Sequence, residues 1–128
     1  MYTVRQIRDM HKKARDAGLS GAFVLNDAVW AQARCNGIGA EWMPKSLRAL
    51  AGKLAPTLEP AAAIHDIHYH YCKSKADQRY ADVEFLANSV RLARAAYKWF
   101  DPRQQIVIFR ALRFYIALRL FGHWAWRR

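Results

Sequence analysis

Helical patterning is the feature of this sequence that most restricts its fold. Patterns typical of helices dominate the chain, and the alternating apolar and polar pattern of a half-buried strand is almost absent. Glycine and proline residues separate the helical stretches. We therefore predict a small all-α domain that spans residues 1–128. A chain of this length can bury a core without disulfides.

The predicted helices are bounded by residues that favour helix ends. Gly18 favours a stop, Asn26 or Asp27 can cap a helix start, and Pro44 suits a first helical position. Asn36, Gly37 and Gly39 predict a loop over residues 35–43. We expect helices over residues 3–17, 19–34, 44–54, 59–72, 77–98 and 102–121. Residues 1–34 would thus hold the N-terminal helices, and residues 102–128 a basic, aromatic C-terminal helix.

Net charge and cysteine content restrict the class of binding partner and the compartment in which the chain is made. The excess of 21 Lys and Arg over 10 Asp and Glu gives a net charge of +11, which favours an anionic partner such as a membrane, a nucleic acid or an acidic protein. Cys35 and Cys72 provide no disulfide framework of the kind found in small secreted domains. The polar start lacks a signal-peptide core. We expect synthesis in the cytoplasm and action at a membrane, with lysis or a virion as the route out.

A histidine and an aspartate at neighbouring positions form the predicted chemical centre. His65 and Asp66 point about 100° apart around a helix. Tyr69 follows His65 by four residues and therefore shares its face. On the next helix, Asp82 can approach the far nitrogen of His65, and Asp77 is a competing acid. A carboxylate at that nitrogen fixes the imidazole tautomer and makes the histidine a general base.

The predicted loop that precedes this centre suits a metal ion. In Cys35-Asn-Gly-Ile-Gly-Ala40, alternating glycines let the backbone turn its carbonyl oxygens toward one point. Calcium is bound by such oxygens together with carboxylates. If the loop packs near Asp66, its carbonyls and that carboxylate make a calcium site. The ion could then polarise an ester carbonyl and stabilise the oxyanion of a tetrahedral intermediate.

These motifs together resemble the phospholipase A2 superfamily. Its pattern is a glycine loop, then HDxxY, then a downstream aspartate, and it is matched here by AAAIHDIHY at residues 61–69 and ADVEFL at residues 81–86. The likeness covers residues 35–88 and is closest to the short, disulfide-free versions seen in phages, bacteria and parvovirus capsid proteins. It implies a two-helix catalytic core and a calcium loop.

The resemblance also implies a role for each matched residue. His65 would activate water for attack on the sn-2 ester of a glycerophospholipid, Asp82 would orient His65, and Tyr69 would hydrogen-bond to Asp82. Calcium ligands would be the Asp66 carboxylate and the backbone carbonyls of Cys35, Gly37 and Gly39. Ala40 departs from the Gly or Asn of many members, which leaves the loop alignment open by one residue. The expected products are a fatty acid and a lysophospholipid, with a phage or bacterial membrane as the target.

Arginines interrupt the apolar C-terminal segment. Arg103 and Arg110 share a helical face, whereas Arg119 lies about half a turn away from Arg110. One interpretation is an interfacial anchor, in which arginines reach lipid headgroups while aromatic rings enter the acyl boundary. The other is a helix that packs on the core or on an oligomer or virion partner. Trp124 and Trp126 favour contact with a membrane or another subunit.

Other functional classes remain open at this point. A non-catalytic membrane-binding or virion structural protein could keep the same fold. The charge of +11 also suits a nucleic-acid-binding protein, although the basic residues are dispersed and no reading motif is present.

The other histidines and the cysteines have interpretations of their own. His65, His68 and His70 suggest zinc, but no further ligand has metal-site spacing, and we expect His68 and His70 at surface or helix-end positions. A Cys-His hydrolase that uses Cys35 or Cys72 is the least favoured alternative.

Overall fold

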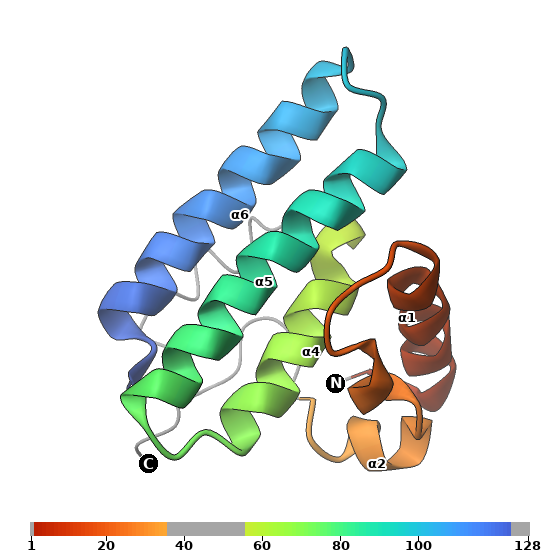
Figure 1. Ribbon diagram of the computed structural model, residues 1–128. Coiled ribbons are helices and arrows are strands. Elements are labelled where there is room, and N and C mark those ends of the chain that lie inside the picture. The colour runs from red at the N-terminus through yellow and green to blue at the C-terminus, as the bar shows by residue number, and fades with distance from the viewer. Residues whose placement is uncertain (1, 36–55, 124–128) are drawn as a thin grey trace.

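A computed structural model describes residues 2–35 and 56–123, and within these ranges the chain is all-α, as predicted (Figure 1). The loop residues 36–43 and the predicted helix over residues 44–54 lie outside the described residues. The elements are α1 (Val4–Asp16), the 3-10 turn η1 (Ala22–Leu25), α2 (Ala28–Gln32), the 3-10 turn η2 (Pro56–Leu58), α4 (Glu59–His70), α5 (Lys75–Ala96) and α6 (Pro102–Phe121).

Side-chain caps determine where several helices begin. Thr3 accepts a hydrogen bond from the Gln6 N–H, and the Gln6 side chain accepts one from the Thr3 N–H, which completes a capping box. Asp27, Ser74 and Asp101 cap α2, α5 and α6 in the same manner. The helix α4 begins at Glu59 without a side-chain cap. The predicted starts near residues 3, 59, 77 and 102 are confirmed to within about two residues.

Residues 19–34 do not form the one continuous helix that was predicted, although the predicted N-cap at Asp27 is confirmed. Gly21 adopts a left-handed conformation with φ 77°, and Asp27 is extended with ψ 101°. Neither conformation fits inside an α-helix. The segment therefore splits into η1 and the short helix α2, with Asp27 as the N-cap.

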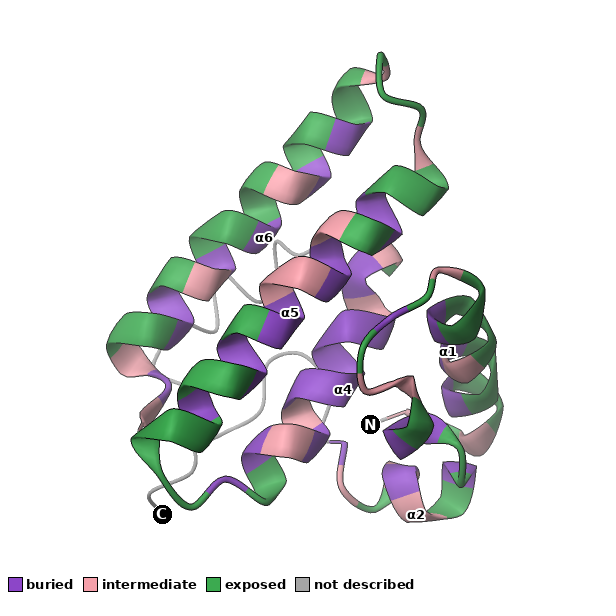
Figure 2. Cartoon of the chain, in the orientation of Figure 1, coloured by how far each residue is buried: buried purple, intermediate pink, exposed green. Residues whose placement is uncertain are grey.

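The longest helix described, α5, lies between α4 and α6 (Figure 1). A short connection at residues 71–74 joins α4 to α5, and another at residues 97–101 joins α5 to α6. On its other side α4 contacts α1 and η1. Burial follows this arrangement, because α4 is covered on both sides and most of its residues are buried (Figure 2). No helix within the described ranges is both long and apolar enough to cross a membrane.

Phe85 connects α4, α5 and α6 through the core. Its side chain is 1% exposed on α5. Its ring centroid lies 5.5 Å from that of Phe114 on α6 and 5.5 Å from that of His65 on α4. Burial of one such ring contributes roughly 1.5–3 kcal/mol. Through Phe85, the hydrophobic core therefore packs directly against His65 of the predicted chemical centre.

Two glycines with positive φ allow a paired test of local packing. A Cβ at Gly21 would lie 2.9 Å from Glu84 Oε1 and 3.1 Å from Ile64 Cγ2, whereas one at Gly18, with φ 69°, would meet nothing within 4 Å. We expect Gly18→Ala to cost about 1 kcal/mol of unfolding free energy through the left-handed backbone alone. Gly21→Ala should cost at least about 1 kcal/mol more, because it also overpacks the contact. Urea unfolding measures both, and equal losses would contradict the close approach of Glu84 and Ile64 to Gly21.

Candidate active site

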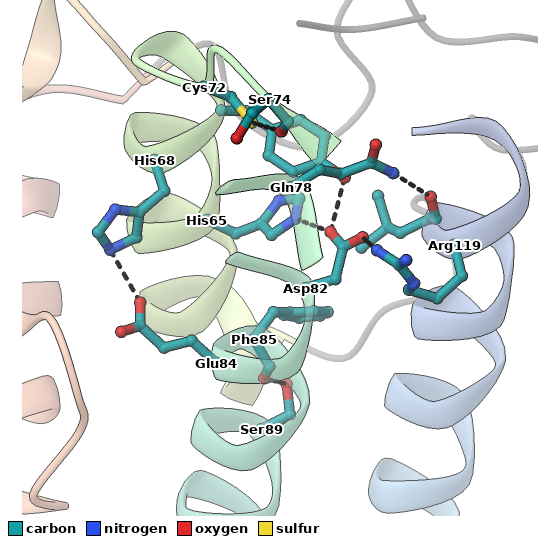
Figure 3. Close-up of polar contacts among 12 residues, drawn as sticks. His65, His68, Cys72, Ser74, Gln78, Asp82, Glu84, Phe85, Ser89 and Arg119 are labelled. Atoms are coloured by element: carbon teal, nitrogen blue, oxygen red, sulfur yellow. Dashed lines mark hydrogen bonds and ion pairs between the residues drawn. The ribbon is translucent and has the colours of Figure 1, made fainter. Parts of the chain in front are cut away.

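The carboxylate of Asp82 is fully buried and is contacted by side chains from two other helices (Figure 3). Its Oδ1 lies 2.8 Å from His65 Nε2 and accepts a 2.6 Å hydrogen bond from the Tyr69 hydroxyl, both on α4. Its Oδ2 accepts a 3.0 Å bond from Arg119 on α6. A buried carboxylate is costly unless it is paired and hydrogen-bonded. These donors meet that requirement.

The His65 ring is held in one orientation. It is 5% exposed, and its centroid lies 4.1 Å from that of Tyr69. When Nε2 donates to Asp82, Nδ1 carries the lone pair. Among the described residues, Asp82 is the hydrogen-bond partner of the ring, through Nε2. A carboxylate-oriented imidazole with its second nitrogen available is chemically suited to accept a proton from water.

Tyr69 completes this arrangement as a hydrogen-bond donor. Burial, the charge of Asp82 and the hydrogen bond to Asp82 raise the pKa of Tyr69 far above its ordinary value. The hydroxyl therefore stays protonated near neutral pH. Its close surroundings explain the glycine that follows α6, because a Cβ at Gly122 would collide with the Tyr69 hydroxyl and lie 2.5 Å from the Leu118 carbonyl.

Between the two candidate acids, the structure places Asp82 against His65. Asp77 lies in the first turn of α5, where its Oδ2 accepts a hydrogen bond from the Lys73 N–H at 3.0 Å. Asp77 therefore stabilises the connection between α4 and α5 and does not contact His65. The predicted contacts of Asp82 with His65 and Tyr69 are present, while their catalytic roles remain predictions.

Asp66 lies on a different side of α4 from His65, close to the start of the predicted calcium loop. Burial raises the pKa of the Cys35 thiol to about 12, and the negative charge of Asp66 adds to this shift. Burial also raises the pKa of Tyr2, with further contributions from Glu59 and Asp66. Cys35 and Asp66 are therefore near enough to interact electrostatically. The other two predicted ligands, Gly37 and Gly39, lie outside the described residues.

A metal site built from side chains alone is absent from the described ranges. Within them, no group of three His, Cys, Asp or Glu side chains could hold a metal ion. The zinc interpretation of His65, His68 and His70 therefore gains no support. The predicted calcium site differs in kind, because it combines one carboxylate with backbone carbonyls.

Neither cysteine has the character of a nucleophile. Cys35 and Cys72 are free and buried. A thiol pKa of about 12 at Cys35 leaves almost no thiolate near neutral pH, and burial also raises the pKa of Cys72. The geometry thus disfavours the Cys-His hydrolase alternative.

A second histidine-carboxylate pair joins α4 to α5, and the sequence did not suggest it. Nε2 of His68 lies 2.8 Å from Glu84 Oε1, and Ser20 Oγ donates a 2.8 Å hydrogen bond to Glu84 Oε2. His68 does lie in the last turn of α4, as one of the two expected positions, but its side chain is only 25% exposed and is paired with Glu84. His70 is exposed at the end of α4, as expected.

Arg119 is the other residue whose place was missed. In the interpretation of α6 as a lipid anchor, Arg119 did not share the helical face of Arg110. The structure shows why. Its side chain is 35% exposed and turns inward to Asp82. The irregular spacing was the available signal, because an arginine off the polar face of a helix needs a partner elsewhere.

Comparisons with known proteins add no relative, since no protein-family model, curated protein or solved structure matches the chain. The resemblance to the phospholipase A2 superfamily therefore comes from the sequence motifs alone and stays a prediction.

Removing Arg119 should destabilise the fold because it leaves Oδ2 of buried Asp82 without this donor. We expect Arg119→Gln to lower the unfolding free energy by about 1–2 kcal/mol. Arg110→Gln is the matched control on the same helix, and as an exposed change it should stay within about 0.5 kcal/mol of the original protein. Urea unfolding at neutral pH distinguishes them, and equal effects would argue against the Arg119–Asp82 contact.

Glu84 should make stability depend on pH in the acid range. Burial acts to raise the pKa of Glu84, but the close contact with His68 and the hydrogen bond from Ser20 outweigh it and lower the pKa below its ordinary value of 4.5. A lowered folded-state pKa gives stability that is present above the ordinary value and is lost as the pH falls through the folded value. Glu84→Gln should therefore flatten the fall of unfolding free energy below about pH 4.5. An unchanged pH profile in urea unfolding would contradict the pairing.

Proposed function

We propose that this chain is a calcium-dependent esterase of the phospholipase A2 type, which hydrolyses the sn-2 ester of glycerophospholipids. The observation that carries the proposal is the contact of His65 Nε2 and the Tyr69 hydroxyl with one oxygen of buried Asp82, at 2.8 and 2.6 Å. This places an oriented imidazole on the helix that also carries Asp66.

The proposed reaction uses the far nitrogen of His65. Nδ1 accepts a proton from a water molecule as the water oxygen attacks the ester carbonyl carbon, and Asp82 stabilises the imidazolium that forms. The tetrahedral intermediate then collapses as the bond to the sn-2 oxygen breaks. His65 returns its proton to that leaving oxygen. Tyr69 and Arg119 keep Asp82 in position throughout.

The residues at the start of the glycine loop are compatible with calcium. Asp66 supplies a hard carboxylate, and Cys35, the first residue of the loop, donates from Sγ to the Ala63 carbonyl of the same helix at 3.6 Å. The proposed ligands are the Asp66 carboxylate and the carbonyls of Cys35, Gly37 and Gly39. Bound calcium would polarise the ester carbonyl and stabilise negative charge on its oxygen.

An anionic phospholipid bilayer is the proposed partner. The net charge of +11 supports this choice, because each well-placed Lys or Arg contributes about 1 kcal/mol of attraction to such a surface. We propose a phage or bacterial membrane-directed role, in lysis, entry or toxin-like action.

Fatty acid release from mixed phospholipid vesicles tests the proposal. The original protein should release fatty acid with calcium and not with chelator. His65→Ala should reduce the rate at least about 100-fold, which is the usual contribution of a general base. His68→Ala is the matched control, because it removes a carboxylate-paired histidine from the same helix and should keep most of the activity.

Folding of each variant is checked by circular dichroism. Absence of release from any lipid by folded original protein would sink the proposal and favour a non-catalytic membrane or virion role. Equal losses in the two histidine variants would remove His65 from the reaction while leaving the fold interpretation intact.

A further inference from the structure

The outward face of α6 carries an apolar stripe that nothing in the described part of the chain covers (Figure 2). We call this set the α6 stripe, and its members are 40% to 62% exposed. They are Ile106, Phe109, Leu112, Ile116 and Leu120. Trp99 and Phe100, 82% and 64% exposed, lie at the turn where α6 begins, beyond the end of the stripe (Figure 1).

The stripe is a separate face and not the ragged edge of the core. At about 100° per residue, its members fall within about 120° of one another around the helix. The opposite side of α6 is buried against α5 and carries Val107, Ala111, Phe114 and Leu118. A helix with one apolar face in the core and a second facing solvent has a surface that suits another apolar partner.

Positive charge accompanies the stripe. The helix contains Arg103, Arg110, Arg113 and Arg119 and no Asp or Glu. Arg110 and Arg113 form no ion pair with any described residue, whereas Arg103 is paired with Asp101. Arg113 lies within the arc of the stripe, with its guanidinium 5.9 Å from the Phe109 ring centroid. Exposed apolar side chains flanked by unpaired arginines are the composition of helices that lie in a membrane interface.

We propose that the α6 stripe, with Trp99 and Phe100, is the surface by which the protein docks on anionic lipid bilayers. This inference deepens the proposed function, since it names the face that meets the substrate membrane. The helix would lie along the interface, with the stripe in the acyl boundary and Arg110 and Arg113 among the headgroups. Trp99 and Phe100 would enter at one end.

Charge placement favours a bilayer over a second copy of the chain. Arg113 is at the midpoint of the stripe, between Ile106 and Leu120. A two-fold antiparallel pairing of two stripes would therefore bring Arg113 of one chain against Arg113 of the other. Like charges directly opposed in a desolvated interface are unfavourable. An anionic bilayer accepts both the apolar side chains and the arginines.

The same helix reaches the candidate active site. Arg119 lies between Ile116 and Leu120 along the chain, at the edge of the stripe, and its guanidinium contacts Asp82. Docking through the stripe would therefore act on a helix that already touches the His65–Asp82 pair. Membrane contact and the candidate active site would be joined by a single helix.

The first test is co-sedimentation with vesicles in chelator, so that binding is measured without hydrolysis. One vesicle type contains phosphatidylcholine and phosphatidylglycerol in equal parts, and the other contains phosphatidylcholine alone. Ile116→Glu and Phe109→Glu should each weaken partitioning to the anionic vesicles at least about tenfold, because each removes an apolar group from the contact. Val29→Glu on α2 is the matched control, since Val29 is 65% exposed and the charge change is identical. It should stay within about twofold of the original protein.

A second readout separates this proposal from the proposed function. Release of fatty acid from dispersed short-chain lipid should survive Ile116→Glu, while release from vesicles should fall with binding. Vesicle binding that is unchanged by both stripe variants, or lost equally in Val29→Glu, would overturn the docking surface even if the enzyme is active. A stripe-dependent dimer in sedimentation velocity without vesicle binding would overturn it as well. Absence of hydrolysis together with stripe-dependent binding would refute only the enzyme.

Discussion

The buried carboxylate of Asp82 is the interaction on which the arrangement of α4, α5 and α6 depends. It lies on α5, receives two contacts from α4 through His65 and Tyr69, and receives a third from α6 through Arg119. Removing a carboxylate from water is expensive, and each of these donors offsets part of that cost. The requirement fixes how α4 and α6 sit against α5 more strictly than apolar packing alone, which tolerates rearrangement.

The second pair adds a different constraint to the same helices. Asp82 and Glu84 are two residues apart, so their side chains leave opposite sides of α5, and Glu84 meets His68 of α4 and Ser20 of the N-terminal segment. Asn88 reinforces that side, because its amide donates to the Ser20 carbonyl and its oxygen accepts from the Ser20 N–H, both at 2.9 Å. The His65–Asp82 and His68–Glu84 pairs therefore have different structural roles. One orients an imidazole beside α6, and the other attaches the N-terminal elements to α4 and α5.

Local chemistry explains which parts of this structure could be predicted. Helix starts at Thr3, Asp27 and Asp101 follow from side chains that cap nearby N–H groups, and the contact of His65 with Asp82 follows from two helices joined by a short connection. The contact of Tyr69 with Asp82 was an expectation from the resemblance. Arg119 was not predictable in this way. Its contact depends on the rotation and axial offset of α6 against α5, which are set by core packing over many residues. The Ser20 contact to Glu84 has the same origin, since 64 positions separate the two residues.

The position of Arg119 links the candidate chemistry to the outer surface of α6. A bilayer that takes up the stripe would restrain this helix, because its apolar side chains would gain burial only in one orientation. The guanidinium of Arg119 extends from the edge of the stripe to Oδ2 of Asp82, so the restraint acts on the group that holds the partner of His65. A ligand can shift a conformational equilibrium only through a difference in its affinity for the two states. If α6 has freedom to move in solution, binding of the stripe to lipid provides such a difference, and the His65–Asp82 pair is the part of the site that would respond.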